Sequence, residues 1–249
     1  MMMIVVNRSA GKNMWKLTII GYGRLGKSIE ALLSIPHTIV RKHETVPLSD
    51  IYYLTVPDRC IEEVASSLPY NSTVIHASGS LPHTILRPHP HTAVLHPIMT
   101  FPGPEVKLPS QPIYASIDGD PQAIPKAQWL AEQVGFSTFP YNGTRARYHC
   151  AAVMAGNFGA VLLDMAANIM ASDSDLNTKE AREKLLPLMI ESIQNCAQEG
   201  AKAFTGPIVR KDQKTIQQHR RELLSFSDHY IRTYDALSKS IIQQHKEKN

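Results

Sequence analysis

The chain has 249 residues, which is enough for one large domain or two modest ones with a substantial core. Its net charge of +4 is small and dispersed, so the composition argues against a nucleic-acid-binding protein and fits an anionic small-molecule ligand. The three cysteines show no CxxC spacing, which argues against a disulfide framework or a zinc site and favours a reducing cytoplasm.

The chain begins with a short apolar stretch that lacks the layout of a cleavable signal peptide. Met14 falls just before the first expected strand, so we expect residues 1–13 to be a disordered extension or the product of an upstream mis-start. No apolar run approaches the length of about 20 residues that a membrane-spanning helix needs, so no membrane partner is expected.

The most informative segment is an apolar strand followed by a glycine-patterned turn and a helix. In such a turn the first glycine permits the tight bend, the second lets the backbone approach a diphosphate, and the third lets the helix pack on the strand. The helix N-terminus adds unpaired N–H groups and the positive end of its dipole. The segment predicts a dinucleotide site rather than a turn without ligand, made of Gly21, Tyr22, Gly23, Arg24, Leu25 and Gly26.

The end of the second expected strand, residues 37–40, indicates which dinucleotide binds. NAD sites usually carry an Asp or Glu there, which accepts a hydrogen bond from the ribose 2′-hydroxyl. Here Arg41 and Lys42 follow the strand, and the nearest acid, Glu44, is too far along. A guanidinium and an ammonium suit the additional 2′-phosphate of NADP. We therefore expect NADP as the cofactor; the alternative is a solvated basic loop.

The rest of the first half alternates between apolar strands and amphipathic helices. Expected strands cover residues 51–56, 73–76, 93–96, 113–117 and 136–139, with helices near 61–68 and 124–134. This alternation predicts an α/β fold with a doubly wound sheet. Residues 42–50 are too few for a helical crossover, so we expect the usual third strand and its helix to be missing.

Ligands of such sheets lie outside the carboxyl ends of the strands. We therefore expect Thr55, Val56 and Pro57 beside the adenosine or nicotinamide ribose. By the same reasoning, Ser78 and His96 should face the nicotinamide side.

Beyond a turn at residues 142–143 the pattern becomes helical. Residues 145–171 are apolar almost all round, which predicts a helix buried in a second domain or in a dimer. Further helices are expected from Thr178 to about residue 203, after Asp212, and after Ser227 or Asp228. We expect residues 14–142 to bind the nucleotide and residues 143–249 to form a helical domain for substrate binding and dimerisation.

Seven stretches carry a family resemblance: IIGYGRLG (19–26), YLTVPD (53–58), HASGSL (76–81), LHPIMTF (95–101), YHCAAVMAGNF (148–158), LLPL (185–188) and FTGPIVRKD (204–212). Together they resemble a family of NADP-dependent oxidoreductases with a Rossmann-like domain and a helical domain of uncharacterised function. The wider superfamily is similar to that of pyrroline-5-carboxylate reductase, ketopantoate reductase, and the 6-phosphogluconate and 3-hydroxyisobutyrate dehydrogenases. The last motif of the family usually reads Arg-Gly-Asp, and Lys211 replaces its glycine here.

The resemblance implies candidate catalytic residues. In the relatives a Lys or His early in the first helix of the second domain acts as acid or base, and an Asn follows it. His149 and Asn157 occupy comparable positions. His149 would protonate a carbonyl oxygen or an imine nitrogen as hydride arrives, and Asn157 would hydrogen-bond the substrate. The alternative for His149 is a core or interface histidine beside Tyr148.

The segment from Thr205 to Arg210 resembles an anion-handling turn between helices. Arg210 would hold a substrate carboxylate through two parallel hydrogen bonds. The alternative is a salt bridge from Arg210 to Asp212 or Glu199.

No metal site is expected. Several histidines occur close together, but their spacing does not place two of them on one helical face, and no acid lies among them. They are His83, His89, His91 and His96.

These observations predict an NADPH-dependent reductase that transfers a hydride to a small 2-oxo acid of the ketopantoate type or to a cyclic imine. We expect a cytoplasmic homodimer formed through the helical domain. The alternative functions are a non-catalytic NADP-binding sensor or partner-recognition module, and a cleft that binds no nucleotide. Fold alone does not decide between them.

Overall fold

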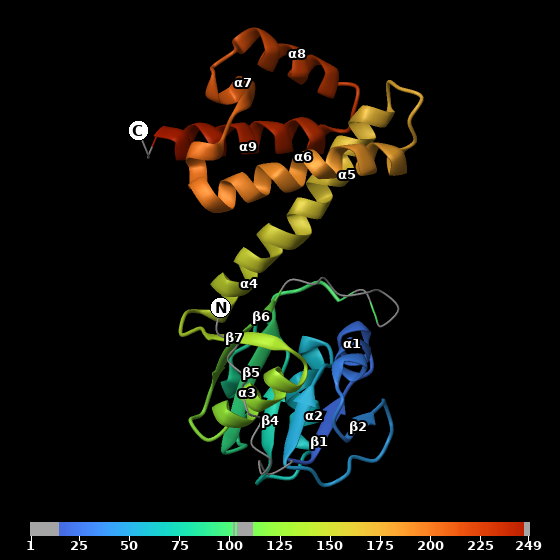
Figure 1. The fold of residues 1–249 in the computed structure, drawn as a ribbon, viewed down its shortest axis with the longest axis vertical. Helices are drawn as coiled ribbons and strands as arrows, with labels where there is room; N and C mark the ends of the chain where they lie inside the picture. Colours follow the sequence, from blue (N-terminus) through green and yellow to red (C-terminus); the bar gives the residue numbers. More distant parts are fainter. Residues whose placement is uncertain (1–14, 102, 104–111, 247–249) are drawn as a thin grey trace, which may run out of the picture. The chain divides into compact units, whose positions relative to one another are not determined.

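The computed structural model describes residues 15–101, 103 and 112–246 (Figure 1). The chain divides into two compact units, Met1–Met154 and Ala155–Asn249. The expected disordered extension, residues 1–13, lies outside the described residues. The unit boundary falls within a long helical run, and the domain limits expected from the sequence, 14–142 and 143–249, stay a prediction.

A seven-stranded sheet forms the centre of the first unit, in the order β2-β1-β3-β4-β5-β6-β7 (Figure 1). Every neighbouring pair is parallel except β5 and β6, which are antiparallel. The expected α/β fold is thus confirmed as a mixed sheet. The strands are β1 Leu17–Ile20, β2 His37–Val40, β3 Ile51–Leu54, β4 Thr73–His76, β5 His91–Pro97, β6 Ile113–Gly119 and β7 Phe136–Pro140.

The connection from β2 to β3 contains no helix, as its length predicts, and β3 pairs directly with β1 in parallel. The antiparallel pairing of β5 with β6 was not anticipated. It places His96 opposite Ser116 across the two strands. Such register partners are close neighbours in an antiparallel sheet.

Both faces of the sheet are covered, because the central strands are apolar on each side. On one face, Ile29 of α1 (Arg24–Leu32) and Leu130 of α3 (Ile124–Gln133) pack against strand residues such as Tyr53. On the other face, Ile61 of α2 (Ile61–Ser66) and Leu86 of the short helix η2 (His83–Leu86) pack against strand residues including Leu54 and Val74.

The second unit is helical. Its α-helices are α5 Gly159–Ala171, α6 Thr178–Glu199, α7 Gly206–Val209, α8 Gln213–Leu223 and α9 Asp228–Lys246, and the short helix η4 Gly200–Ala203 follows α6. Asn177 and Glu180 form a reciprocal capping box at the start of α6. Asp212 accepts a hydrogen bond from the Thr215 backbone N–H at 3.1 Å, so its expected role as an N-cap is confirmed.

The helical run 145–171 consists of α4 (Arg145–Val153), a π-helical segment η3 (Met154–Phe158) and α5. Only 6 % of its most apolar window is buried, so the expected burial inside a domain is not found in the single chain. Phe158 and Val161 are each 54 % exposed. By length and composition alone this helix is also able to cross a membrane, which the sequence analysis did not anticipate; helices in the cores of soluble proteins pass the same test.

Candidate functional site

A groove of about 940 Å³ lies in the first unit, along the carboxyl ends of β1 to β4. Most of the predicted cofactor residues line it: Gly21, Tyr22, Gly23, Leu25, Arg41, Lys42, Thr55, Val56, Pro57 and Ser78. Of the remaining three, Arg24 is exposed at the first position of α1, Gly26 is buried beneath the turn, and His96 lies at the end of β5.

The three glycines of the turn have different surroundings. Gly21 has φ +108°, and a Cβ there would lie 2.8 Å from the carbonyl oxygen of Thr55. A Cβ at Gly26 would lie 2.2 Å from the carbonyl oxygen of Gly21. Gly23, the N-cap of α1, has no atom within 4 Å of the position of a Cβ. Gly21 and Gly26 are therefore needed by the fold, whereas Gly23 leaves open space at a helix N-terminus, a position that favours negative charge.

Thr55, at the end of β3, holds the glycine turn in place. Its Oγ1 donates a hydrogen bond to the Gly21 carbonyl at 2.9 Å, and its backbone N–H donates to Ile20 at 2.8 Å.

The residues after β2 form a basic end of the groove. The Arg41 guanidinium lies over the Tyr22 ring, 4.4 Å from its centroid. The expectation that Glu44 is too far along was wrong: a turn returns its Oε2 to the Arg41 backbone N–H, 2.7 Å away. The turn is closed by a hydrogen bond from the Glu44 N–H to the Arg41 carbonyl at 3.2 Å. The Glu44 carboxylate therefore lies beside the end of β2, although Glu44 comes four residues after the last residue of that strand.

Asp58 orders the loop after β4. One of its carboxylate oxygens accepts hydrogen bonds from the hydroxyls of Ser78 at 2.8 Å and Ser80 at 2.7 Å. Asp58 also lines the groove. Sequence reasoning missed it, although its place directly after the third strand was a usable signal.

A buried cation lies beside the nicotinamide side expected from the sequence. Arg145 is 4 % exposed; it donates to the Ser116 hydroxyl at 3.0 Å and to the Ser78 carbonyl at 3.3 Å. Its Nε has no hydrogen-bond partner, and within the described ranges no carboxylate lies within 4.0 Å of the guanidinium. Burial lowers the pKa of Arg145. A buried, unpaired positive charge favours an anion nearby.

Tyr148 links this cation to His96. The Tyr148 ring lies 4.3 Å from the Arg145 guanidinium, and its hydroxyl lies 2.7 Å from Nδ1 of His96. Burial lowers the pKa of His96 to about 4, with Arg145 contributing, so this imidazole is neutral at pH 7. Burial raises the pKa of Tyr148, whereas hydrogen bonding to Ser116 and the charge of Arg145 act in the opposite direction.

His149 lies next to this cluster. Its ring centroid is 6.3 Å from that of His96. A Cβ at Gly79 would lie 2.7 Å from Cδ2 of His149 and 2.8 Å from Nε2 of His96, so this glycine lets the two imidazoles approach the same backbone. Sequence reasoning named His149 and His96 but missed Arg145 and Tyr148, whose spacing of three residues places them on one helical face.

The other predicted site residues belong to the second unit, and their roles stay predictions. Asn157 is exposed in the π-helical segment. Thr205 is the N-cap of α7, and Arg210 is its exposed C-cap. Hydrogen bonds from Thr215 lower the pKa of Asp212, and Arg210 adds to this without coming within 4.0 Å as an ion pair.

Two of the clustered histidines have structural hydrogen bonds. His83 Nδ1 lies 2.9 Å from the Thr92 hydroxyl, and the buried His89 lies 2.8 Å from the Ala65 carbonyl. Among the residues that the structure describes, no group of three or more His, Cys, Asp or Glu is placed to hold a metal.

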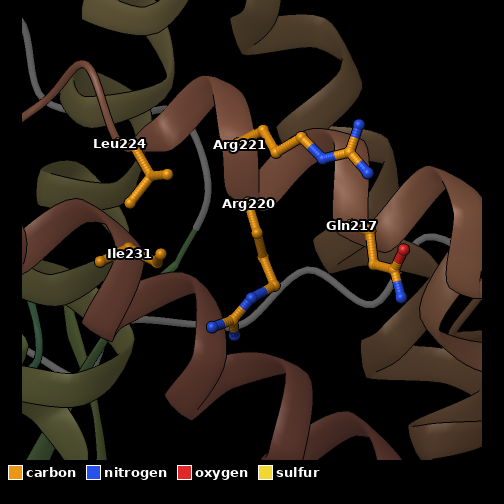
Figure 2. A pocket seen from close by; sticks show the side chains of 5 residues that line it. All are labelled: Gln217, Arg220, Arg221, Leu224 and Ile231. Atoms are coloured by element: carbon orange, nitrogen blue, oxygen red, sulfur yellow. The ribbon is translucent and has the colours of Figure 1, made fainter.

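A smaller hollow of about 290 Å³ lies between α8 and α9, lined by Gln217, Arg220, Arg221, Leu224 and Ile231. Figure 2 shows that the two arginine side chains diverge. Arg220 is paired with Asp235. This hollow therefore lacks the convergent polar groups of the groove in the first unit.

Comparison with known proteins identifies a family over more than half of the chain, from β6 into α9. Residues 113–241 match the family described as a domain of unknown function (DUF2520). No curated protein matches the chain by sequence.

Solved structures show the same fold over almost the whole chain. The protein TM1727 of Thermotoga maritima is 24 % identical, with 94 % of this chain and 100 % of that chain covered and a TM-score of 0.71. The Bacteroides fragilis protein BF3122, described as a proposed NADP oxidoreductase, is 21 % identical, with coverage of 91 % and 97 % and a TM-score of 0.77. A reductive aminase of Aspergillus terreus, solved with NADPH and ethyl levulinate, is 13 % identical, with coverage of 93 % and 95 % and a TM-score of 0.66. The resemblance to a Rossmann-like domain followed by a helical domain is thereby confirmed.

Proposed function

Since the chain belongs to the family described as a domain of unknown function (DUF2520), whose description assigns no chemistry, we propose a function from its groove: an NADPH-dependent reductase of small 2-oxo acids or cyclic imines. The observation that carries this proposal is the open backbone at Gly23. A helix N-terminus without a side-chain cap meets open space there, at the edge of a groove large enough for a dinucleotide.

The groove residues fit a nicotinamide dinucleotide. The backbone of Gly21 to Gly23 and the first turn of α1 would hold the diphosphate. Arg41 and Lys42 line the groove beyond it and offer a guanidinium and an ammonium to the 2′-phosphate of NADP. Thr55, Val56 and Pro57 would line the ribose positions, with Ser78 toward the nicotinamide.

When bound, the reduced cofactor supplies a hydride. The chain must then orient an acceptor carbon, supply a proton and stabilise developing negative charge. His149, half-buried beside His96, is the proposed proton donor. The buried charge of Arg145 favours a substrate with a carboxylate and an oxyanion as it forms, which supports a 2-oxo acid of the ketopantoate type.

The helical unit supplies the proposed substrate contacts Asn157, Thr205 and Arg210, and we further propose that it mediates a cytoplasmic homodimer. Large apolar side chains are exposed on α5 and α6, including Val161, Leu188 and Ile193. A second copy is favoured over a membrane as their cover, because the helical run starts in the first unit with Arg145 and Tyr148 buried there.

The decisive experiment measures coenzyme binding before turnover. NADPH and NADH are titrated into the full chain by calorimetry, followed by a screen of NADPH oxidation against 2-oxo acids, aldehydes and imines. Tight NADPH binding with turnover supports the reductase. Binding without turnover across the whole screen supports the alternative, an NADP sensor. Absence of heat with both coenzymes would overturn both functions.

The role of His149 has its own variant. His149→Ala should abolish turnover of any substrate found and leave the affinity for NADPH nearly unchanged, because the residue lies outside the groove lining. His229→Ala, in α9 of the second unit, is a matched control that keeps turnover. Equal loss of turnover and coenzyme affinity in His149→Ala would contradict the assignment.

A further inference from the structure

The carboxylate of Glu44 contacts Arg41, the cation that we propose binds the 2′-phosphate of the cofactor. Its Oε2 accepts the Arg41 backbone N–H at 2.7 Å, and its Oε1 lies 3.7 Å from the Arg41 Nη1. His43 takes a φ of 70° within the turn that brings the carboxylate back to the strand end. Arg41, His43 and Glu44 all line the groove.

The Arg41 guanidinium also contacts an aromatic ring. It lies over the Tyr22 ring at 4.4 Å, and the Tyr22 hydroxyl donates to Glu30 at 2.6 Å. Lys42 lines the same end of the groove and has no ion pair within the part of the chain that the structure describes. The basic end thus contains one cation that is paired internally and one that is not.

We propose that Glu44 is a built-in competitor of the 2′-phosphate for Arg41 and thereby sets the preference between NADPH and NADH. A 2′-phosphate that binds Arg41 must displace the Glu44 carboxylate. The carboxylate also repels the phosphate, because both groups are negatively charged and would lie beside the same guanidinium. NADH carries no phosphate at this position and does not meet that repulsion. The inference rests on the proposed function in one respect: the groove binds a nicotinamide dinucleotide.

The competing role for Glu44 is the one that an acid has in NAD sites, where it accepts a hydrogen bond from the ribose 2′-hydroxyl. In this structure the carboxylate already accepts the Arg41 N–H with one oxygen and faces the guanidinium with the other. Both side chains are about half exposed, 54 % for Arg41 and 45 % for Glu44, so the pair can open toward an incoming anion.

The test is Glu44→Gln, which removes the charge but keeps an amide oxygen for the Arg41 N–H. Calorimetric titration with NADPH should show binding about two- to fivefold tighter than wild type at low ionic strength, the scale of an exposed charge pair. The gain should shrink as salt is added, because salt screens the repulsion. NADH affinity should stay the same.

Glu62→Gln is the matched control. Glu62 is exposed on α2, is not among the residues that line the groove and is not paired with Arg41, so the same loss of one negative charge should leave NADPH affinity unchanged. When Arg41→Gln is already present, adding Glu44→Gln should raise NADPH affinity by only a small part of the increase seen in the wild-type background. The reason is that the cation for which the carboxylate and the phosphate compete is absent.

Each outcome separates this inference from the proposed function. Binding of NADPH to the wild-type protein with no tightening in Glu44→Gln overturns the inference alone. Weaker NADH binding in that variant also overturns it and assigns Glu44 to the ribose hydroxyl. Equal tightening in Glu62→Gln would show that the effect comes from net charge alone and likewise overturns the inference. Failure of the wild-type protein to bind either coenzyme removes both proposals.

Discussion

At the scale of single residues, two glycines of one turn lead to opposite expectations. Gly26→Ala places a methyl group 2.2 Å from the Gly21 carbonyl oxygen, and backbone at that distance must move. We expect a loss of about 1–3 kcal/mol in the free energy of unfolding, measured by denaturant titration. A stability equal to that of the wild-type protein would contradict the packing seen at the turn.

Gly23→Ala tests the open side of the same turn. Nothing lies within 4 Å of the added methyl group, and Gly23 has a φ of −75° that alanine adopts readily. Stability should therefore change by less than about 0.5 kcal/mol. NADPH affinity should nevertheless fall at least tenfold, because the methyl group occupies the space where a diphosphate approaches the backbone. An unchanged affinity would argue against the proposed cofactor position.

A buried histidine, His76, and a half-buried one, His96, make the first unit sensitive to acid. Burial lowers the pKa of His76 and of His96 to about 4. In the unfolded chain they titrate near pH 6.5, so between pH 6.5 and 4 the unfolded state binds more protons. The free energy of unfolding should fall by at least about 1 kcal/mol from pH 7 to pH 5, measured by urea unfolding. His96→Asn should reduce this slope; equal slopes in variant and wild type would contradict the burial effect.

At the scale of elements, the turn after α7 carries strain at Lys211. Its φ of 57° lies in the left-handed region that favours glycine, and glycine is the residue that the resembling family usually has there. A side chain in this region costs about 1–2 kcal/mol, partly offset by the lower unfolded-state entropy of lysine. Lys211→Gly should therefore raise the free energy of unfolding by up to about 1 kcal/mol, visible as a higher melting temperature.

A glycine in a regular helix provides the matched comparison. Lys239 lies within α9, so Lys239→Gly should lower the free energy of unfolding by about 1 kcal/mol. If Lys211→Gly is destabilising as well, the left-handed backbone at Lys211 is not a source of strain.

At the scale of the whole molecule, the exposed apolar side chains predict a homodimer. Val161 on α5 is 54 % exposed, and Ile193 on α6 is 55 % exposed. Patches of this kind mark interaction surfaces. A chain with both Val161→Glu and Ile193→Glu should sediment as a monomer, because buried charges destabilise an apolar interface. The groove in the first unit should still bind NADPH in the variant.

Leu224→Glu is the control for the dimer. Leu224 is the C-cap of α8 beside the smaller hollow and belongs to neither α5 nor α6, so a charge there should not change the oligomeric state. A wild-type protein that sediments as a monomer at all concentrations would contradict the proposed interface.

Much of this protein could be determined from the sequence because the signals are local. The apolar strands, the glycine turn and the N-cap at Asp212 depend on residues that are neighbours in the chain. The missing crossover helix follows from the length of a single connection. The position of the groove was predictable for the same reason, since the carboxyl ends of parallel strands meet at one edge of a sheet.

The tertiary structure alone decided the features that depend on distant pairs. His96 and Tyr148 are 52 positions apart and meet at 2.7 Å, which required the antiparallel β5–β6 pairing and the start of α4. The unpaired charge of Arg145 is evident only from its burial, and the return of Glu44 to Arg41 only from the turn between them. Local sequence carries no record of such contacts, because the free energy of each arises from the packing of segments that the chain brings together on folding.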